Sequence, residues 1–524
     1  MKNAWVVLLA LCLGCSGGFS VKNAAKTNIL RTTMNTNPTT LDPAIVQDID
    51  TQGIIDNVFE GLVQWDANNT LQPLLADKWS LSPDGKTYTF HIRRGVKFHN
   101  GREVTPEDVQ YSLERSCNPD LNSPTAANYL GDIVGAKERF ARKADHVAGI
   151  EHDSENVTIH LDKPRPYFLG KLTYPCAFIV AKVGAGPGKE ISKIEQMIGT
   201  GPFKADSFLP DQQLTLSAFN DYHGGRPKLE RIEEIVMKDS QTRIDKFRAG
   251  EVEMAGVARQ DALPLSKDVK LGNEVQFEAR PAVAYVAMSK NGYPPFADAR
   301  VRRAIAMAVD KRNIVEVLLG GSNPLAEGIL PPGIAGHRDR PNGLPYDPKA
   351  AANLLAEAGY PGGKGLPALE LVIRDQTPDT RIVAEAIASQ IGANLGVKVT
   401  LKTMEWRSLL ESRNHNKLGF FILSWYADYL DPQNFLSTLL TTSGSANHFG
   451  YSNPEVDKLC GEADSELDQT KRIVLYDKAE DMILNDAPWL PLYYVRDAEL
   501  VSPKVTGLEQ NLLGHMPYTK VEVK

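Results

Sequence analysis

Two glycine-rich stretches of this 524-residue sequence are the first places to look for a nucleotide-binding loop. The stretch from Gly184 to Lys189 is one residue short of a phosphate loop, and Glu190 stands where a Ser or Thr hydroxyl would bind magnesium. In the second stretch, which begins at Gly199, Lys204 occupies the position of the third glycine of a dinucleotide-binding fingerprint. The sequence therefore predicts no nucleotide site, and we interpret the first stretch as an exposed loop.

The spacings that mark common hydrolases and zinc sites are also missing from the sequence. It contains no H-E-x-x-H motif, no G-x-S-x-G turn and no paired-cysteine framework, and its ten histidines are scattered without ligand spacing. The formal net charge is −7, with no basic stripe of the kind that binds nucleic acid. We therefore predict no metal, no cofactor and no nucleic-acid partner, and we expect a binding protein rather than an enzyme.

The elements that must position any site include a β-hairpin over residues 79–93. Its turn, Pro83–Gly85, has the residue types that tight turns favour, and the residues after it alternate between apolar and polar, which is typical of a half-buried strand. A helix is expected to follow, with Thr105 as its N-cap and Asp108 closing a capping box. This region therefore predicts strand, strand and helix in succession.

Further along the chain, three segments have helical spacing and clear end signals. The clearest helix covers residues 298–319, with Asp298 as its cap and two glycines at its end. The others run from Pro348 to Ala358 and from near Arg381 to residue 396, before a strand at residues 397–401. Helices and strands that alternate in this way predict α/β layers with substantially parallel sheets.

Chain length and the first fifteen residues bear on domain number and compartment. A chain of 524 residues is too long for one hydrophobic core, so we expect two or three domains. Lys2 is followed by an apolar run from Ala4 to Leu13 and then by Gly14 and Cys15, which resembles a bacterial lipobox. We predict that residues 1–14 are a signal peptide and that Cys15 is lipidated. An ordinary secretory signal cut nearby is the alternative.

Three cysteines would remain in the exported protein besides Cys15, in a compartment that permits disulfides. Cys117 and Cys176 could pair and leave Cys460 free. Connectivity is not readable from spacing, so the pairing stays open.

Five segments carry a pattern that extends across the chain after the leader. The second segment is the densest and reads SPDGKTYTF, then RGVKFHNG, then VTPEDV. In their order and spacing the segments resemble family 5 of the bacterial extracellular solute-binding proteins, which holds the oligopeptide- and dipeptide-binding receptors of ABC importers. The segments lie at residues 59–79, 82–109, 199–203, 295–312 and 489–494.

The resemblance implies an α/β fold of the two-lobed periplasmic-binding-protein type, with three domains of mixed sheets flanked by helices, and a hinge. Domain I would be discontinuous, domain II would be inserted into it, and domain III would form the other lobe. The chain would cross between the lobes near residues 275 and 495, and hinge closure would enclose the ligand. The expected boundaries are 20–65, 195–275 and 495–524 for domain I, 66–194 for domain II and 276–494 for domain III.

A peptide ligand would present an α-ammonium, a carboxylate and a backbone whose polar groups must be satisfied away from water. The segment from Ser424 to Phe435 contains a W-x-x-D-x-x-x-P context in which the resemblance places a carboxylate against the ligand's ammonium, and Asp428 falls on that position. Trp425 and Tyr426 would form flat walls beside it. The alternative for Asp428 is a helix cap or a turn residue.

Two further residues are candidates for contact with the ligand. The dipeptide receptors place an Arg near the ligand's far end, where Arg381 lies in this sequence, and a guanidinium fork would match a carboxylate. A solvent-exposed Arg near a helix start is the alternative. Tyr285, in a strand-like run, would either face the cleft or belong to the core. A clamp at Arg381 would imply short peptides of fixed length, and its absence would allow longer ones.

The sequence thus predicts an extracytoplasmic, lipid-anchored, monomeric receptor that captures short peptides and delivers them to the permease and ATPase subunits of an ABC importer. A receptor of the same fold for a nickel complex, haem or a sugar derivative is the alternative, because a fold does not fix its ligand. A non-transport role, as a chemosensory ligand presenter or a folding helper, is a third possibility.

Overall fold

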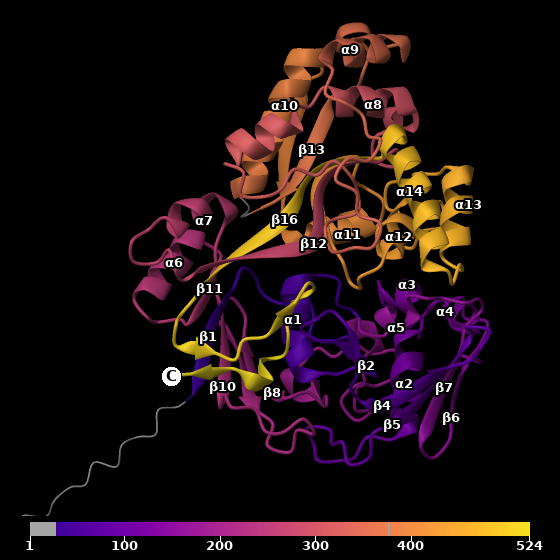
Figure 1. Ribbon diagram of the computed structural model, residues 1–524, viewed down its shortest axis with the longest axis vertical. Helices are drawn as coiled ribbons and strands as arrows, with labels where there is room; N and C mark the ends of the chain where they lie inside the picture. Colours follow the sequence, from indigo (N-terminus) through magenta and orange to yellow (C-terminus); the bar gives the residue numbers. More distant parts are fainter. Residues whose placement is uncertain (1–27, 376–377) are drawn as a thin grey trace, which may run out of the picture.

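The computed structural model describes residues 28–375 and 378–524, which fold into two lobes joined by long strands (Figure 1). The predicted signal peptide and the lipidation site Cys15 lie outside the described residues. In Figure 1 the lower lobe holds the indigo and magenta first part of the chain, the upper lobe holds the orange part, and the yellow C-terminal segment returns to the lower lobe. Among the described helices, none combines the length and apolar character that crossing a bilayer requires.

Two four-stranded sheets form the lower lobe. The first has the order β1-β10-β9-β8, in which β1 and β10 are parallel and the other neighbours antiparallel. The second has the order β4-β5-β7-β6 and is antiparallel throughout. Short strands β2 (Val63–Trp65) and β3 (Leu71–Pro73) connect the two parts. The sheet strands are β1 (Ile29–Met34), β10 (Arg231–Val236), β9 (Gln213–Ala218), β8 (Phe203–Leu209), β4 (Ala76–Leu81), β5 (Thr87–Ile92), β7 (Asn156–His160) and β6 (Ile150–His152).

The predicted hairpin and the helix after it are confirmed in the second sheet. β4 and β5 pair around a turn in which Gly85 has a φ of +72°, a conformation that glycine adopts without strain. The helix α2 (Pro106–Ser116) begins at the predicted cap, because the Thr105 N–H donates to Asp108 Oδ2 at 2.9 Å. The alternating face of β5 is buried as expected, through Tyr88, Phe90 and Ile92.

A six-stranded sheet dominates the upper lobe, with the order β11-β16-β12-β15-β13-β14. β13 is parallel to β14 and β15, and the other neighbours are antiparallel. The long strands β12 and β16 lie side by side between the lobes (Figure 1), so both chain crossings run through this pair. The strands are β11 (Met254–Gly256), β16 (Trp489–Val501), β12 (Val275–Met288), β15 (Phe420–Tyr426), β13 (Leu369–Arg374) and β14 (Val399–Met404).

Helices cover these sheets and complete two core clusters in each lobe. Besides α2, the lower lobe has α1 (Ile49–Val58), α3 (Ala126–Leu130), α4 (Ala136–Phe140) and α5 (Phe168–Lys171). Two helices flank the connecting strands, α6 (Ser240–Arg248) and α7 (Arg259–Ser266). The upper lobe has α8 (Ala299–Met307), α9 (Pro348–Glu357), α10 (Pro378–Leu395), α11 (Trp406–Asn414), α12 (Leu436–Leu440), α13 (Pro454–Ala463) and α14 (Gln469–Asp486).

The helix predicted over residues 298–319 is in fact two. It begins at the predicted cap, Asp298, but α8 ends at Met307, and a separate π-helical segment covers Asn313–Leu318. The Asp310 carboxylate accepts a hydrogen bond from the Asn313 N–H at 3.0 Å, so it caps the new segment. The helices α9 and α10 confirm the other two helix predictions.

The prediction of substantially parallel sheets is wrong. Most neighbouring strands among the described sheets are antiparallel, because hairpins such as β4–β5 and β8–β9 and the returning strand β16 supply them. Alternation of helices and strands along the chain gives no information about a strand such as β16, which comes back to its sheet from far away in sequence. The sheets are mixed, as the family resemblance implied.

The three cysteines of the described chain are buried free thiols, so the possible Cys117–Cys176 disulfide is not formed. Cys117 and Cys176 belong to the same lower-lobe core, and burial raises the pKa of both thiols well above the ordinary range. These residues therefore behave as small apolar groups.

Candidate functional site

A cavity of about 1280 Å³ lies between the lobes and is the main candidate site. It is larger than the roughly 300–1,000 Å³ of typical small-molecule pockets, which favours a ligand bigger than one amino acid. Both lobes and the connecting strands contribute to its walls. The lining residues fall within segments 33–57, 122–129, 238–243, 256–258, 278–280, 374–375, 379–380, 405–415, 422–428, 445–448 and 493–518, together with Tyr174.

The structure places Asp428 in the wall of this cavity, just after β15. Its Oδ2 accepts hydrogen bonds from the Tyr129 hydroxyl of the lower lobe and from Asn434 Nδ2, the latter at 3.0 Å. Within the described chain no donor is paired with its Oδ1. Burial raises the pKa of Asp428 to about 6. One oxygen of this desolvated carboxyl is therefore available to a cationic group of a ligand.

Trp425 and Tyr426, the last residues of β15, also line the cavity. The buried Asn434 fixes this part of the wall, because its Oδ1 accepts from Trp425 Nε1 at 3.1 Å and from the Asp428 N–H at 3.0 Å. One amide thus orients the indole ring and both ends of Asp428. Sequence reasoning had no signal for Asn434, since a buried Asn in a loop matches no motif.

Two residues predicted to contact ligand lie elsewhere. Arg381, on α10, is not among the residues that line the cavity; its side chain is 52% exposed and lies 3.7 Å from Glu385, one helical turn away. Arg381 is therefore a solvent-exposed residue near a helix start, which was the alternative to contact with the ligand. Tyr285 is 1% exposed and stacks on Trp489 with ring centroids 3.6 Å apart, so it belongs to the core and not to the cleft.

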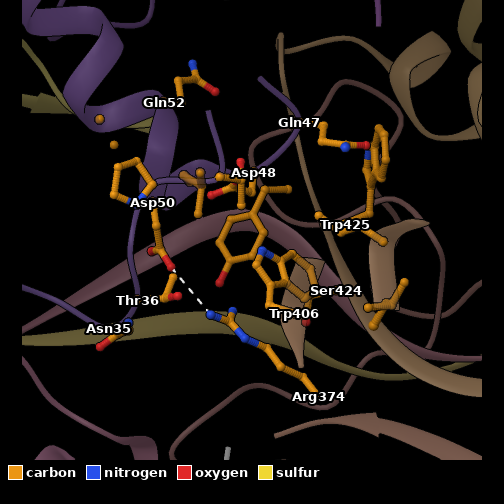
Figure 2. A pocket seen from close by; sticks show the side chains of 18 of the residues that line it. Asn35, Thr36, Gln47, Asp48, Asp50, Gln52, Arg374, Trp406, Ser424 and Trp425 are labelled. Atoms are coloured by element: carbon orange, nitrogen blue, oxygen red, sulfur yellow. Dashed lines mark hydrogen bonds and ion pairs between the residues drawn. The ribbon is translucent and has the colours of Figure 1, made fainter. Parts of the chain in front are cut away.

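Arg374, the last residue of β13, lines the cavity in place of Arg381 (Figure 2). Its guanidinium carbon lies 4.5 Å from the centre of the Trp406 ring, and its Nη2 lies 3.8 Å from Asp50 Oδ2 on the other lobe. Ligands of α/β sheets bind at the carboxyl ends of parallel strands, and β13 is one of these. Its position at the end of such a strand is the signal that would have identified Arg374.

Arg413, on α11, also lines the cavity. It donates to the side-chain oxygen of Gln47 on the other lobe at 3.4 Å and to Asn414 at 2.9 Å. No carboxylate in the described ranges forms an ion pair with it, and burial lowers its pKa. A desolvated guanidinium whose contacts are neutral amides is suited to an anionic group of a ligand.

Acidic residues of the lower lobe face the arginine side of the cavity. Burial raises the pKa of Asp50 to about 6, although the Arg374 guanidinium opposes that shift. Burial also raises the pKa of Asp56, which lies six residues further along α1, to about 7. Figure 2 shows Asp50 reaching toward Arg374 across the cavity. In this arrangement of the lobes these carboxyls are therefore partly desolvated.

Glu278, Glu499 and His515 form a potential metal-ligating group at the end of the cavity near the connecting strands, with their ligand atoms within 4.8 Å of one another. His515 Nε2 lies 2.8 Å from Glu499 Oε2, and Arg280 Nη1 lies 3.8 Å from Glu278 Oε2. Each carboxylate thus already has a cationic or potentially cationic neighbour, which is enough to account for the cluster without an ion.

Comparisons with known proteins agree with this architecture. The family model of the bacterial extracellular solute-binding proteins, family 5 (middle region), matches residues 70–447. The heme-binding protein A of Haemophilus influenzae is 32% identical over 485 residues, which cover 89% of this chain and 87% of that protein. The dipeptide-binding protein DppE of Bacillus subtilis is 29% identical over 541 residues, which cover 98% of both chains.

A solved relative distinguishes two arrangements of the lobes. The murein tripeptide binding protein MppA of Escherichia coli matches with a TM-score of 0.87 at 28% identity, over 95% of this chain and 99% of that one. The unliganded open form of MppA gives a TM-score of 0.68 at 27% identity, over 95% and 98%. The lobes described here therefore lie in an arrangement unlike that open form. We call the arrangement described here the closed arrangement. The two-lobed fold is confirmed, and the chain belongs to the bacterial extracellular solute-binding proteins of family 5.

Proposed function

We propose that this protein captures short peptides in the cleft between its lobes and delivers them to the permease and ATPase subunits of an ABC importer. One observation carries the proposal: the Asp428 carboxyl and the Arg413 guanidinium, which has no carboxylate partner in the described chain, line a single cavity. A free peptide carries one charge of each sign at its two ends. Charge-assisted hydrogen bonds to both ends would hold it without reference to its sequence.

The peptide ammonium would pair with Asp428 Oδ1, while Tyr129 and Asn434 hold Oδ2. The peptide carboxylate would pair with Arg413 or with Arg374, which enter the cavity from different elements. Two arginines at different places along one wall would accept peptides of more than one length. The volume of the cavity leaves room for side chains, which would explain why a receptor of this kind tolerates many sequences.

A receptor for haem or another non-peptide solute is the second candidate. Its support is the 32% identity to heme-binding protein A, together with the flat rings of Trp406 and Trp425 in the wall and two arginines able to pair with carboxylates. The two candidates differ at Asp428. A ligand that has no amine leaves that carboxyl without its partner, so Asp428→Ala would then change affinity little.

Native mass spectrometry of the form lacking residues 1–15, followed by denaturing extraction of whatever copurifies, tests the proposal. A ladder of short peptides of mixed sequence is the expected result, because recognition of the two termini ignores side chains. A single porphyrin or other non-peptide mass would overturn the peptide proposal and favour the second candidate. Trialanine added to the refolded, ligand-free protein then measures affinity directly.

We further propose that Cys15 is lipidated and anchors a monomeric receptor outside the cytoplasm, with the domain boundaries given above and a hinge in β12 and β16 near residues 275 and 495. The membrane is then a partner only through the lipid. Expressed from its full-length gene, Cys15→Ser is expected to move the protein from the membrane fraction to the soluble exported fraction. Membrane retention of that variant would argue for a different anchor.

A further inference from the structure

Tyr429, the residue after Asp428, lies outside the core of its own lobe and inside that of the other. It is 1% exposed and belongs to the lower-lobe core cluster around the sheet β4-β5-β7-β6, in which every other buried member lies between residues 62 and 181. The chain around it, from β15 to α12, belongs to the upper lobe. A single aromatic side chain therefore crosses the interface and is buried only while the lobes are together.

The lower lobe provides a shaped socket for this ring. Tyr167 stacks against it with ring centroids 6.3 Å apart and planes 16° apart, and Tyr129 meets it edge-on at 6.2 Å and 82°. Gly170 forms the floor. A Cβ at Gly170 would lie 2.9 Å from the Cβ of Tyr429 and only within ordinary contact distance, 3.6 Å, of Trp65. The absence of a side chain at residue 170 is thus required by Tyr429 and not by its own lobe.

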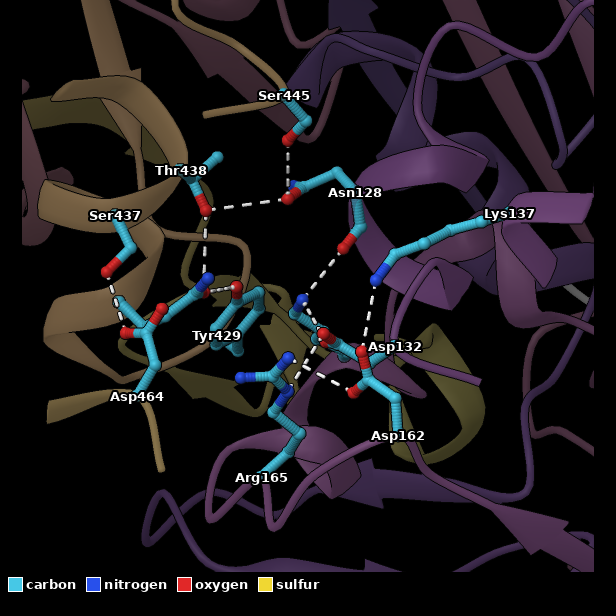
Figure 3. A network of polar contacts seen from close by, with 12 residues as sticks. Asn128, Asp132, Lys137, Asp162, Arg165, Tyr429, Ser437, Thr438, Ser445 and Asp464 are labelled. Atoms are coloured by element: carbon cyan, nitrogen blue, oxygen red, sulfur yellow. Dashed lines mark hydrogen bonds and ion pairs between the residues drawn. The ribbon is translucent and has the colours of Figure 1, made fainter. Parts of the chain in front are cut away.

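Polar contacts between the lobes surround the inserted ring (Figure 3). The Asn128 side-chain oxygen of the lower lobe accepts from the Ser445 hydroxyl at 2.8 Å and from Thr438 Oγ1 at 3.4 Å, both in the upper lobe. The Tyr429 hydroxyl donates to Gln433 of its own lobe, so its polar atom is satisfied as the ring enters apolar surroundings. Tyr129, one wall of the socket, donates to Asp428.

We propose that Tyr429 is the latch of lobe closure, a positioning residue that couples solute capture at Asp428 to docking of the lobes. Tyr429 is not among the residues that line the cavity, so it acts through its neighbour and not on the solute. Asp428 and Tyr429 are consecutive residues of one turn, and the Asp428 N–H is fixed by Asn434, so a shift of one moves the other. The latch itself does not depend on which solute is bound.

Gly170→Ala is the test, because the added methyl group collides with Tyr429 only when the lobes are closed. With trialanine as the probe, we expect a loss of affinity on the order of tenfold or more, because overpacking this close contact destabilises the closed arrangement. Small-angle scattering should show a variant that stays extended at trialanine concentrations that compact the wild type. The melting temperature of the ligand-free variant should equal that of the wild type.

Gly461→Ala is the matched control, since Gly461 is also a helical glycine and a Cβ there meets nothing within 4 Å. Tyr429→Ala is the second variant: it removes the ring, and it should weaken closure while the ligand-free melting temperature stays unchanged. Wild-type affinity and full compaction in both Gly170→Ala and Tyr429→Ala would overturn the latch. The latch would also be overturned if Gly170→Ala lost ligand-free stability as well as closure while Tyr429→Ala closed normally.

Binding of trialanine by the wild type distinguishes a failure of the latch from a failure of the proposed function. Failure of the wild type to bind trialanine would count against the peptide proposal alone. The same comparison of variants with wild type then uses the solute that copurifies, and retention of that solute by Tyr429→Ala at wild-type levels would still overturn the latch.

Discussion

Asp428 offers one oxygen to the ligand and keeps the other bound to Tyr129 and Asn434. Replacing it with Asn preserves the shape and removes the charge. Asp428→Asn is therefore expected to weaken binding of a free peptide by about 2–5 kcal/mol, the usual cost of truncating a desolvated charge pair. Isothermal titration with trialanine measures the loss.

N-acetyl-trialanine provides the matched ligand for this experiment, because it has no ammonium. It should bind weakly to the wild type and to Asp428→Asn alike. An equal loss for the free and the acetylated peptide would show that Asp428 acts only through the structure of the turn.

Arg413 and Arg381 provide a second comparison at the scale of single residues. Arg413→Ala should weaken trialanine binding by about 1.5–3 kcal/mol, the net worth of hydrogen bonds to a charged group. Arg381→Ala is the control, because this side chain is half-exposed and paired with Glu385 outside the cavity. Affinities for trialanine and its C-terminal amide check the assignment. If Arg413→Ala weakens the amide as strongly as the acid, Arg413 does not bind the carboxylate.

The sequence reveals the type of a site residue more readily than the direction of its side chain. Asp428, Trp425 and Tyr426 lie in one short segment with a strong resemblance, and the structure brings all three to the cavity. Arg381 and Arg374 lie seven residues apart, and only the end of β13 decides which one faces the cleft. Tyr285 lies in β12, a central strand whose successive residues point to opposite faces of the sheet. Both faces are buried around Tyr285, so the alternation does not show which face meets the cleft.

At the scale of elements, the ion pair between Arg115 on α2 and Asp42 joins parts of the lower lobe that are far apart in sequence. Both side chains are almost fully buried, and Nη2 lies 2.5 Å from Oδ2. Arg115 Nη2 also donates to the Lys189 carbonyl at 2.6 Å, and its Nε to the Gly186 carbonyl at 3.2 Å. Two carbonyl groups of the glycine-rich stretch that looked like a phosphate loop thus accept hydrogen bonds from a buried guanidinium.

Arg115→Ala is expected to lower the free energy of unfolding by about 3–5 kcal/mol, because it leaves the Asp42 carboxylate buried without its counter-ion. Urea denaturation followed by circular dichroism measures the change. Lys246→Ala is the control: its pair with Glu251 has a similar distance, 2.6 Å, but is about half-exposed, so it should cost less than about 1 kcal/mol. Comparable losses in the two variants would contradict the role assigned to burial.

Local signals along the chain determine some elements well and others poorly. The hairpin around Gly85 and the helices capped by Thr105 and Asp347 begin where the sequence predicts, because turns and caps are made by neighbouring residues. The break between α8 and the segment Asn313–Leu318 depends on more distant contacts, since the Asp310 N–H donates to Gln390 on α10 at 2.6 Å. Sheet order depends on such contacts throughout.

The whole molecule combines a large cavity between the lobes, a pair of connecting strands and an interface that closes over charged groups. In the closed arrangement burial raises the pKa of Asp50 and of Asp428 from the ordinary value to about 6. In an open cleft these groups would be solvated and ionised at neutral pH. Charged carboxylates therefore oppose closure of the empty cleft, and a ligand that neutralises them favours it.

The sign of this linkage predicts how pH acts on the empty receptor. A state in which a carboxyl has the higher pKa binds more protons, so acid favours the closed arrangement, by up to about tenfold per pH unit for each carboxyl between the two pKa values. Small-angle scattering of the ligand-free protein should show compaction as the pH falls from 7 to 5. Asp50→Asn should be more compact than the wild type at pH 7 and should respond less to acid. A closed fraction that is independent of pH, or that falls in acid, would show that desolvation of these carboxyls does not hold the empty cleft open.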